Sequence, residues 1–173
     1  MRLKPNTLIV VAGPTASGKT TLAIQIAKAV DGEIVSADSM QIYRGVGIAT
    51  AKPTPEELAA VPHHLIGFLP MDRAFSVADY AELARKEIND ILSRGKVPVL
   101  CGGTGLYIKA IVDNVQYSEA ITGDEALRER LRQLAEREGN DALWRRLEAM
   151  DPETAKRIHP NNVGRVIRAI EVM

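Results

Sequence analysis

The sequence has 173 residues, of which 46% are hydrophobic and 25% charged, and its formal net charge is zero. A chain of this size can bury one core and begin a second unit, and its neutrality argues against a protein that holds nucleic acid through a global positive field. No apolar stretch approaches the roughly 18 residues that cross a bilayer, so we expect a cytoplasmic protein with no membrane partner.

The first third of the chain reads as strand, loop, helix and strand. Residues 8–12 form a continuous apolar run, which predicts a buried parallel strand. A glycine-containing loop follows, and from Lys19 the apolar residues recur at helical spacing. Residues 33–37 predict a second short strand, which delivers Asp38 at its carboxyl end.

The next elements repeat this alternation. Residues 76–79 resemble a capping box that opens a helix, and Gly95 is expected to end that helix. Residues 97–101 predict another buried strand, which places Cys101 in the core, and a glycine-rich turn then leads into a helix near Leu106. The pattern predicts an α/β fold with a mostly parallel sheet, helices on both faces, and ligands at the carboxyl ends of the strands.

The character of the chain changes after Asn114. Residues 125–150 carry charges interleaved with leucines at helical spacing, and Asp151-Pro152 is expected to end that helix. Residues 163–173 predict a further amphipathic helix. We therefore expect two domains, a core over residues 1–114 and a helical unit over 115–173.

One motif carries specific chemistry. Gly13-Pro14-Thr15-Ala16-Ser17-Gly18-Lys19-Thr20 matches the phosphate-loop pattern and lies between a predicted strand and a predicted helix, as the motif requires. Backbone N–H groups of such a loop converge on phosphate oxygens, the lysine adds a charge, and the threonine hydroxyl suits Mg²⁺. The loop alone does not distinguish ATP from another diphosphate.

The sequence shows no clear counterpart of the acidic residue that binds the metal ion in ordinary phosphate-loop kinases. Such enzymes place an acidic residue at the end of a later strand, whereas residues 97–101 run into Gly102-Gly103-Thr104. This weakens a phosphoryl-transfer interpretation without excluding it, because Asp38 could hold the metal through water. From its position alone, Asp38 is as consistent with a catalytic or metal-binding role as with capping a turn.

Several strings of residues resemble the signatures of the tRNA dimethylallyltransferases. They are the phosphate loop itself and residues 36–45, 50–54, 61–66, 75–80, 95–98, 102–107, 151–153 and 157–162. The resemblance covers essentially the whole chain and implies a P-loop NTPase-like core with a helical tRNA-binding insertion. Because members of this family are longer, it also implies that the insertion is truncated here and that its C-terminal return to the core is missing. Gly47, Ala49 and Gly67 depart from the family pattern.

The resemblance implies an activity and a set of roles. A dimethylallyl group passes from dimethylallyl diphosphate to the N6 amine of the adenine 3′-adjacent to the tRNA anticodon, and pyrophosphate leaves. Asp38 acts as the general base, and Lys19 and Thr20 with Mg²⁺ stabilise the leaving group, with Asp38 reaching the metal through water. The implied tRNA contacts are Asp38, Ser39, Met40, Gln41, Thr104, Arg128, Gly164, Arg165, Val166, Ile167 and Arg168.

Alternatives remain open at this point. An adenylate isopentenyltransferase would use the same donor on free nucleotides, a small-molecule kinase would use ATP on the same loop, and a fragment could bind phosphate without catalysis. Taken alone, Thr104 would be read as a helix N-cap, and Arg165 and Arg168 could pair with Glu153 and Glu171 instead of RNA. We expect a monomer, and the adjacent His63 and His64 do not form a zinc-binding pattern.

Overall fold

A computed structural model of the chain describes residues 3–45, 52–115 and 124–173. The chain divides into two compact units, Met1–Tyr117 and Ser118–Met173, and each is described by itself. Among the helices of the described ranges, none has the length and apolar character that crossing a membrane requires.

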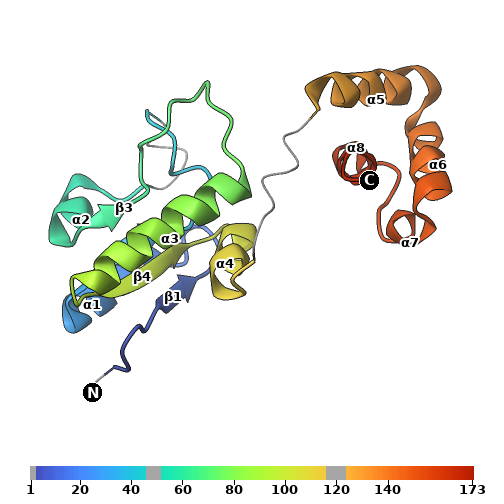
Figure 1. Cartoon of the computed structure of the whole chain (residues 1–173). Helices are drawn as coiled ribbons and strands as arrows, with labels where there is room; N and C mark the ends of the chain where they lie inside the picture. The colour runs from blue at the N-terminus through green and yellow to red at the C-terminus, as the bar shows by residue number, and fades with distance from the viewer. Residues whose placement is uncertain (1–2, 46–51, 116–123) are drawn as a thin grey trace. The chain divides into compact units, whose positions relative to one another are not determined.

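The first unit is built on a parallel sheet (Figure 1). Its strands follow the order β1-β4-β2-β3, and every neighbouring pair is parallel. The central strand β4 pairs with β1 along one side and with β2 along the other. The predicted parallel α/β fold is therefore confirmed. The strand bounds are β1 Ile9–Ala12, β2 Gly32–Ser36, β3 His63–His64 and β4 Val97–Gly102.

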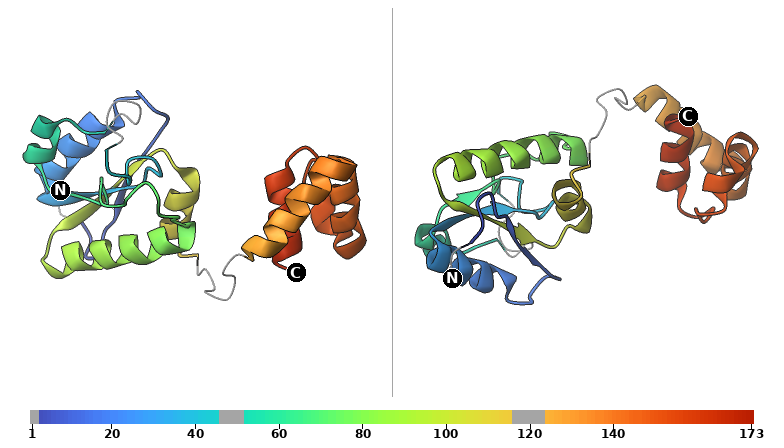
Figure 2. Two further views of the ribbon diagram at one scale, coloured as in Figure 1. Left: turned by 90° about the horizontal axis from the view of Figure 1, so that it is seen from above. Right: turned by 60° about the horizontal axis from the view of Figure 1, so that its bottom comes forward.

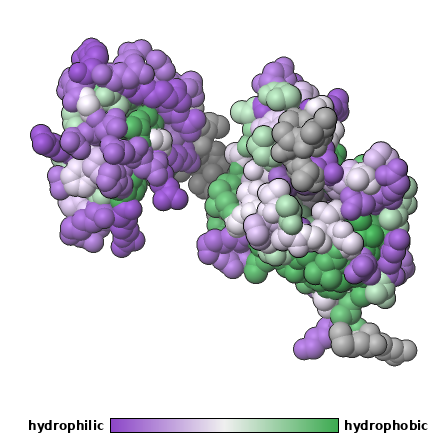
Figure 3. Space-filling model, turned by 180° about the vertical axis from the view of Figure 1, so that it is seen from behind, coloured by the Kyte–Doolittle hydropathy of each residue, from purple (hydrophilic) through white to green (hydrophobic). Residues whose placement is uncertain are grey.

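One expectation about the sheet is met only in part. The apolar run of β1 predicted a buried parallel strand; β1 is parallel to β4, with which alone it pairs among the described residues, but it is only partly buried. Val11 is buried, whereas Val10 is 38% exposed. A continuous apolar run indicates that a strand prefers burial, but it does not indicate how many strands pair with it. The run therefore cannot predict whether the strand is central or at an edge of the sheet. Figure 3 shows hydrophobic residues gathered on one face of this unit.

Helices cover both faces of the sheet, as predicted. Helix α1 lies on one face, and α3 and α4 lie on the other (Figure 2). The capping box at Ser76 opens α3 as expected, since its hydroxyl accepts from the Asp79 N–H while the Asp79 carboxylate accepts from the Ser76 N–H. The helix bounds are α1 Lys19–Val30, α2 Pro55–Ala60, α3 Val77–Ser93 and α4 Gly105–Val112.

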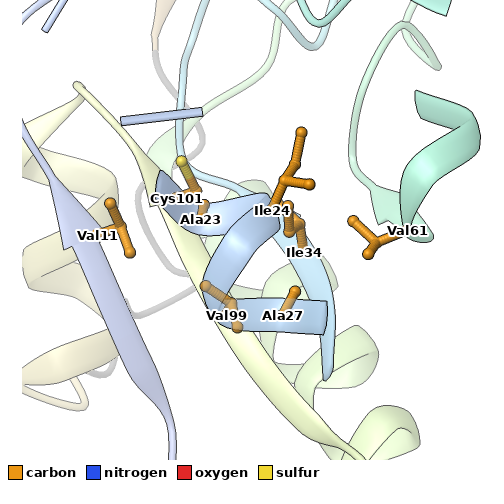
Figure 4. Packing of buried hydrophobic residues seen from close by; sticks show 8 residues of the cluster. All are labelled: Val11, Ala23, Ile24, Ala27, Ile34, Val61, Val99 and Cys101. Carbon is orange, nitrogen blue, oxygen red and sulfur yellow. The ribbon is translucent and has the colours of Figure 1, made fainter. Parts of the chain in front are cut away.

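The two faces of the sheet form two cores because successive residues of a strand point to opposite sides. Along β4, Val99 and Cys101 pack against α1, and Leu100 packs against α3. Figure 4 shows the first of these cores, in which Ala23 and Ala27 allow α1 to approach the sheet closely. Cys101 is thus a buried core residue, as the sequence predicted, and burial raises the pKa of its thiol to about 11.

The second unit is helical, as predicted, but its first helix is divided. Residues 125–150 form two helices separated at Gly139, whose φ of +89° most residues avoid. Leu131, Leu143, Leu147 and Val166 form the centre of its core. The indole N–H of Trp144 donates to two backbone carbonyls, which makes this residue part of the fold. The helices are α5 Glu125–Glu138, α6 Asn140–Met150, α7 Pro152–Ala155 and α8 Val163–Glu171.

Candidate active site

Backbone hydrogen bonds bring three segments together at the carboxyl ends of the strands. The N–H of Gly13, which opens the phosphate loop, donates to the carbonyl of Gly102 at 3.3 Å. On the other side of β4, the N–H of Ala37 donates to the carbonyl of Cys101 at 2.7 Å. The end of β4 therefore links the phosphate loop after β1 to Asp38, the residue that follows Ala37. This is the edge at which parallel sheets bind ligands.

The phosphate loop has the backbone that its motif requires. Gly18 has a φ of +77°, and Ala16, although it is not glycine, has a φ of +62°. Residues 14–18 are exposed, so a phosphate group can approach the loop from solvent. The Lys19 ammonium donates to the carbonyl of Pro14 at 2.9 Å, which holds the cation over the loop. Thr20 lies in the first turn of α1, at the positive end of the helix dipole.

Two glycines at the end of β4 lie close to the backbone of neighbouring segments, and the contact at Gly102 excludes a side chain. A Cβ atom on Gly102 would lie 2.1 Å from the carbonyl oxygen of Ala37, which no side chain tolerates. A Cβ atom on Gly103 would lie 3.1 Å from the carbonyl oxygen of Gly13 and 4.0 Å from the Lys19 nitrogen. An acidic side chain at position 102 would therefore force the strand ends apart. The sequence showed that the acid is missing here, and the structure supplies the reason.

The two carboxylate oxygens of Asp38 lie in different surroundings. Oδ1 accepts hydrogen bonds from the N–H groups of Met40 and Gln41 at 3.0 and 3.3 Å, which is a capping arrangement. Oδ2 has no hydrogen-bond partner among the described residues. Asp38 is half-buried. One oxygen therefore fixes the carboxylate while the other can accept a proton from a substrate.

Thr104 contacts the Asp38 loop directly. Its Oγ1 accepts from the N–H of Ser39 at 2.9 Å and donates to the Ser39 hydroxyl at 3.2 Å. Thr104 also occupies the N-cap position of α4, but its side chain makes no capping hydrogen bond. The N-cap position expected from the sequence is therefore confirmed, but the side chain binds the Asp38 loop and does not cap the helix. Sequence reasoning missed the Ser39–Thr104 pair because no local signal links residues so far apart.

The other predicted RNA-facing residues of this loop differ in exposure. Met40 is 52% exposed, whereas Gln41 is only 8% exposed and its side-chain oxygen lies 3.4 Å from the buried Ser36 hydroxyl. Gly67, one of the departures from the family pattern, has a φ of +60° and donates its N–H to the carbonyl of Gln41. Gly47 and Ala49, the other two departures, lie outside the described residues.

The predicted RNA contacts of the second unit fall into different environments. Arg128 Nε lies 2.7 Å from a carboxylate oxygen of Glu171, whose side chain is 2% exposed, and Arg168 binds the same carboxylate. The hydrogen bond from Arg128 is the main reason that the pKa of Glu171 is lowered to about 2. Arg165 is exposed and has no carboxylate partner among the described residues.

The remaining members of that predicted set also differ. Gly164, at the start of α8, is exposed, whereas Val166 and Ile167 are buried in the core of the unit. Ion pairing, the alternative to RNA binding, is therefore observed for Arg168, which pairs with Glu171. Lys156 likewise pairs with Glu153 at 2.6 Å. Arg165 remains a candidate for binding phosphate.

No feature of the sequence indicated the charged cluster that surrounds Glu33 in β2. Its side chain is 4% exposed and binds Arg94 through both oxygens, His64 at 2.8 Å and Lys96 at 3.3 Å. The hydrogen bonds from Arg94 are the main cause that lowers the pKa of Glu33 to about 2. Glu33 lies at the opposite end of β2 from Asp38. This cluster stabilises the fold and is not part of the candidate site.

The donor set at the phosphate loop fits one kind of metal ion. Within residues 3–45, 52–115 and 124–173 no group of three His, Cys, Asp or Glu side chains is placed to hold a metal. Mg²⁺ does not need such a group, because it is commonly held by one or two protein oxygens together with substrate phosphates and water. The Thr20 hydroxyl, with Asp38 acting through water, matches that chemistry.

A phosphate loop joining the first strand and first helix of a parallel sheet defines a P-loop NTPase-like α/β protein. A family model described as IPP transferase matches residues 41–173. The chain therefore belongs to the IPP transferase family.

Individual relatives agree with this assignment. The chain is 54% identical over 170 residues to a tRNA dimethylallyltransferase of Exiguobacterium sp. and 50% identical over 166 residues to that of Bacillus subtilis. These alignments cover 98% and 96% of the chain but only 54% and 52% of the relatives. The chain thus spans about half the length of the curated relatives it matches.

Solved structures give the same result. A full-length tRNA isopentenylpyrophosphate transferase from Bacillus halodurans is 46% identical, with a TM-score of 0.64 over 96% of this chain and 55% of that one. A eukaryotic dimethylallyltransferase, described as acting on tRNA, is 30% identical, with a TM-score of 0.77 over 93% of this chain and 40% of that one.

Proposed function

We propose that this protein is a tRNA dimethylallyltransferase, which transfers a dimethylallyl group from dimethylallyl diphosphate to the N6 amine of the adenine 3′-adjacent to the anticodon. The observation that carries the proposal is the placement of Asp38. Backbone hydrogen bonds through β4 join its segment to the phosphate loop, and its Oδ2 has no partner among the described residues. In this proposal the proton acceptor and the loop that binds the diphosphate lie at one edge of the sheet.

The phosphate loop would act on the leaving group. As the bond between C1 of the donor and its bridging oxygen breaks, negative charge develops on pyrophosphate. The N–H groups of this exposed loop and the Lys19 ammonium can stabilise that charge more strongly in the transition state than in the ground state. Mg²⁺, when bound near Thr20, would supply further positive charge to the same oxygens.

Asp38 would act on the nucleophile. The N6 amine of adenine is a poor nucleophile because its lone pair is delocalised into the ring. As the N6–C1 bond forms, positive charge would accumulate on nitrogen, and transfer of an N6 proton to Oδ2 prevents that accumulation. The two N–H groups on Oδ1 keep the carboxylate oriented during this step.

The acceptor adenine must leave its RNA loop to enter this edge of the sheet, so base flipping is part of the proposal. The exposed Met40 and the Ser39 hydroxyl lie beside Asp38 in sequence and are the residues we expect to meet the flipped base and its neighbours. We expect the helical unit to bind the anticodon stem, and the protein to work as a monomer in the cytoplasm, where tRNA is modified.

Each competing function requires different structural features. A phosphate-loop kinase needs an acid at the end of β4, and the contact between Gly102 and Ala37 leaves no room for one. An adenylate isopentenyltransferase acts on free nucleotides and does not need a helical unit with exposed arginines. The names of the relatives also favour tRNA as the acceptor.

Deletion of the gene in its host tests the proposal. Mass spectrometry of nucleosides from bulk tRNA should show the loss of isopentenyladenosine, and its return when the gene is restored. In vitro, radiolabelled dimethylallyl diphosphate should label an anticodon stem–loop RNA, without release of phosphate from ATP. Unchanged isopentenyladenosine in the deletion strain, or ATP-dependent phosphoryl transfer in vitro, would overturn the assignment.

A further inference from the structure

The imidazole ring of His64 lies between two carboxylates that belong to different elements. Its Nε2 is 2.8 Å from Glu33 Oε2 of β2, and its Nδ1 is 2.9 Å from Glu87 Oε2 of α3. An ionised carboxylate accepts hydrogen bonds but cannot donate one, and a neutral imidazole carries a single N–H. Both contacts are therefore hydrogen bonds only while the ring holds two protons and a positive charge. In that state His64 ties β3 to α3.

The register of β3 explains why His64, and not its neighbour, meets both acids. His64 pairs with Val35, which packs in the core beneath α3, whereas His63 pairs with Ile34, which packs in the core beneath α1. Adjacent strand residues point to opposite faces. The Nε2 of His63 is buried with no partner among the described residues, and burial lowers the pKa of His63 despite the nearby charge of Glu57 in α2. Its neutral form is therefore favoured.

The surrounding charges make Glu87 the partner that depends on the second proton. Glu33 also binds Arg94, which follows α3, and Lys96, which precedes β4. Within residues 3–45, 52–115 and 124–173 the structure gives Glu87 one cationic partner, which is His64. The Glu33 side chain is 4% exposed and is fixed by Arg94, whereas that of Glu87 is 31% exposed and can turn to water. Loss of a proton from the ring would therefore open the contact with α3.

The segment that follows His64 is bound to the loop that carries Asp38. The N–H groups of Gly67 and Leu69 donate to two carbonyls of that loop, at 2.8 and 3.0 Å. The first of these carbonyls belongs to Gln41, whose own N–H donates to Asp38 Oδ1. Backbone hydrogen bonds thus connect segment 65–69, which starts at the His64 tie, to the proposed base.

The chain bends directly after the tie. Leu65 has a φ of +61° and Gly67 a φ of +60°. The left-handed region is disfavoured for a residue with a side chain, so Leu65 adopts it only where its surroundings hold it there. The Leu65 side chain packs against the core beneath α3, and the contact between His64 and α3 lies immediately before it. The tie therefore anchors the bend that directs segment 65–69 to the Asp38 loop.

We propose that the charged His64 is a positioning residue, which holds segment 65–69 and, through it, the Asp38 loop in the arrangement that proton transfer needs. This inference deepens the proposed function and rests on it, because it takes Asp38 to be the base. Imidazole changes its charge between about pH 5 and 8, so the arrangement should loosen as the pH rises. Asp38 must be ionised to accept a proton, so its own effect on the rate appears on acidification.

Hydrogen exchange tests the tie without an assay of activity. The quantities measured by NMR are the protection factors of the Gly67 and Leu69 N–H groups, which correct for the intrinsic effect of pH on exchange. In the full chain they should fall about fivefold to tenfold between about pH 5.5 and 8, the scale of one lost hydrogen bond at a partly exposed site.

Three variants separate the charge of His64 from its packing. His64→Arg stays charged and can bind both carboxylates at every pH, so its protection factors should stay constant. Glu87→Gln should also stay constant, because an amide can donate to a neutral ring as well as accept from a charged one. Glu82→Gln changes an exposed residue of α3 and is the matched control, which should show the same fall as the parent.

The single-turnover rate of prenyl transfer gives a second measurement. The parent should lose rate on both the acidic and the alkaline side, and His64→Arg should lose rate on the acidic side alone. Protection factors that stay constant in the parent, or that fall equally in the parent and in His64→Arg, overturn the proposal. If His64→Arg does not fold, a parent-like fall in Glu87→Gln overturns it instead. A parent with the expected exchange but no prenyl transfer overturns the proposed function alone and leaves the tie in place.

Discussion

Thr104 Oγ1 accepts a hydrogen bond from the backbone N–H of Ser39 at 2.9 Å, although the two residues are 65 positions apart in the sequence. The bond joins the start of α4 to the loop that carries Asp38. Asp38 is itself held by N–H groups of the same loop, so we infer that Thr104 helps to position the carboxylate. We therefore propose that Thr104 is a positioning residue in the proposed reaction.

Thr104→Val removes this hydroxyl and keeps the shape of the side chain. We expect the single-turnover rate of prenyl transfer to fall about fivefold to tenfold, since a lost hydrogen bond costs about 1 kcal/mol, while the KM for the prenyl donor stays near that of the parent. Thr104→Ser keeps the hydroxyl and is the control that should retain most of the activity. A valine variant as fast as the parent would show that the bond does not position Asp38.

Asp38→Asn replaces the proposed base with an amide of the same size that cannot take up the proton. The chemical rate should fall by about 10²-fold or more, the usual scale for losing a general base, while tRNA binding persists. Single-turnover kinetics measure the first quantity, and anisotropy with the stem–loop RNA measures the second. If the asparagine variant loses RNA binding in proportion to its rate, Asp38 holds the substrate and is not its base.

Local features of this fold were predictable from the sequence, and distant pairings were not. The phosphate loop, the capping box at Ser76 and the helical spacing of α1 each depend on neighbouring residues, so the sequence records them directly. The place of β1 at the sheet edge depends on which strands lie beside it. The Ser39–Thr104 pair and the partners of Glu33 likewise depend on tertiary contacts. Gly139 could have been recognised as a break in the helix by its glycine alone.

The Glu33 cluster predicts an acid-sensitive stability. The pKa of Glu33 is lowered from 4.5 to about 2, so the stability it contributes is complete above pH 4.5 and is lost as the pH falls toward 2. Glu33→Gln should lower the free energy of unfolding at pH 7 by about 2 kcal/mol, less than for a fully buried pair because Arg94 and Lys96 are partly exposed.

Urea unfolding from pH 7 down to pH 3 measures both effects. Since the glutamine cannot titrate, the difference between variant and parent should shrink on acidification. Glu82→Gln changes an exposed glutamate and serves as the control, for which we expect little effect at any pH. A constant difference across the whole range would show that Glu33 contributes through packing and not through its charge.

Arg165 and Arg168 are three residues apart on α8, yet the structure gives them different roles. Arg168 binds the carboxylate of Glu171, whereas Arg165 is exposed and has no carboxylate partner among the described residues. We therefore expect Arg165→Ala to weaken binding of the stem–loop RNA and to flatten the slope of log K against log[salt] by about one. Arg168→Ala should leave that slope unchanged and lower the stability of the unit by up to about 1 kcal/mol, because its partly exposed pair is screened by water.

Salt titrations of RNA binding and urea unfolding of both single variants distinguish these roles. Arg165→Lys keeps the charge and should keep the slope, which separates a phosphate contact from a packing effect. If Arg168→Ala flattens the slope as much as Arg165→Ala does, the ion pair with Glu171 opens when RNA binds and both arginines contact phosphate. If neither variant changes the slope, α8 is part of the fold alone, and the RNA contacts of this unit lie elsewhere on its surface.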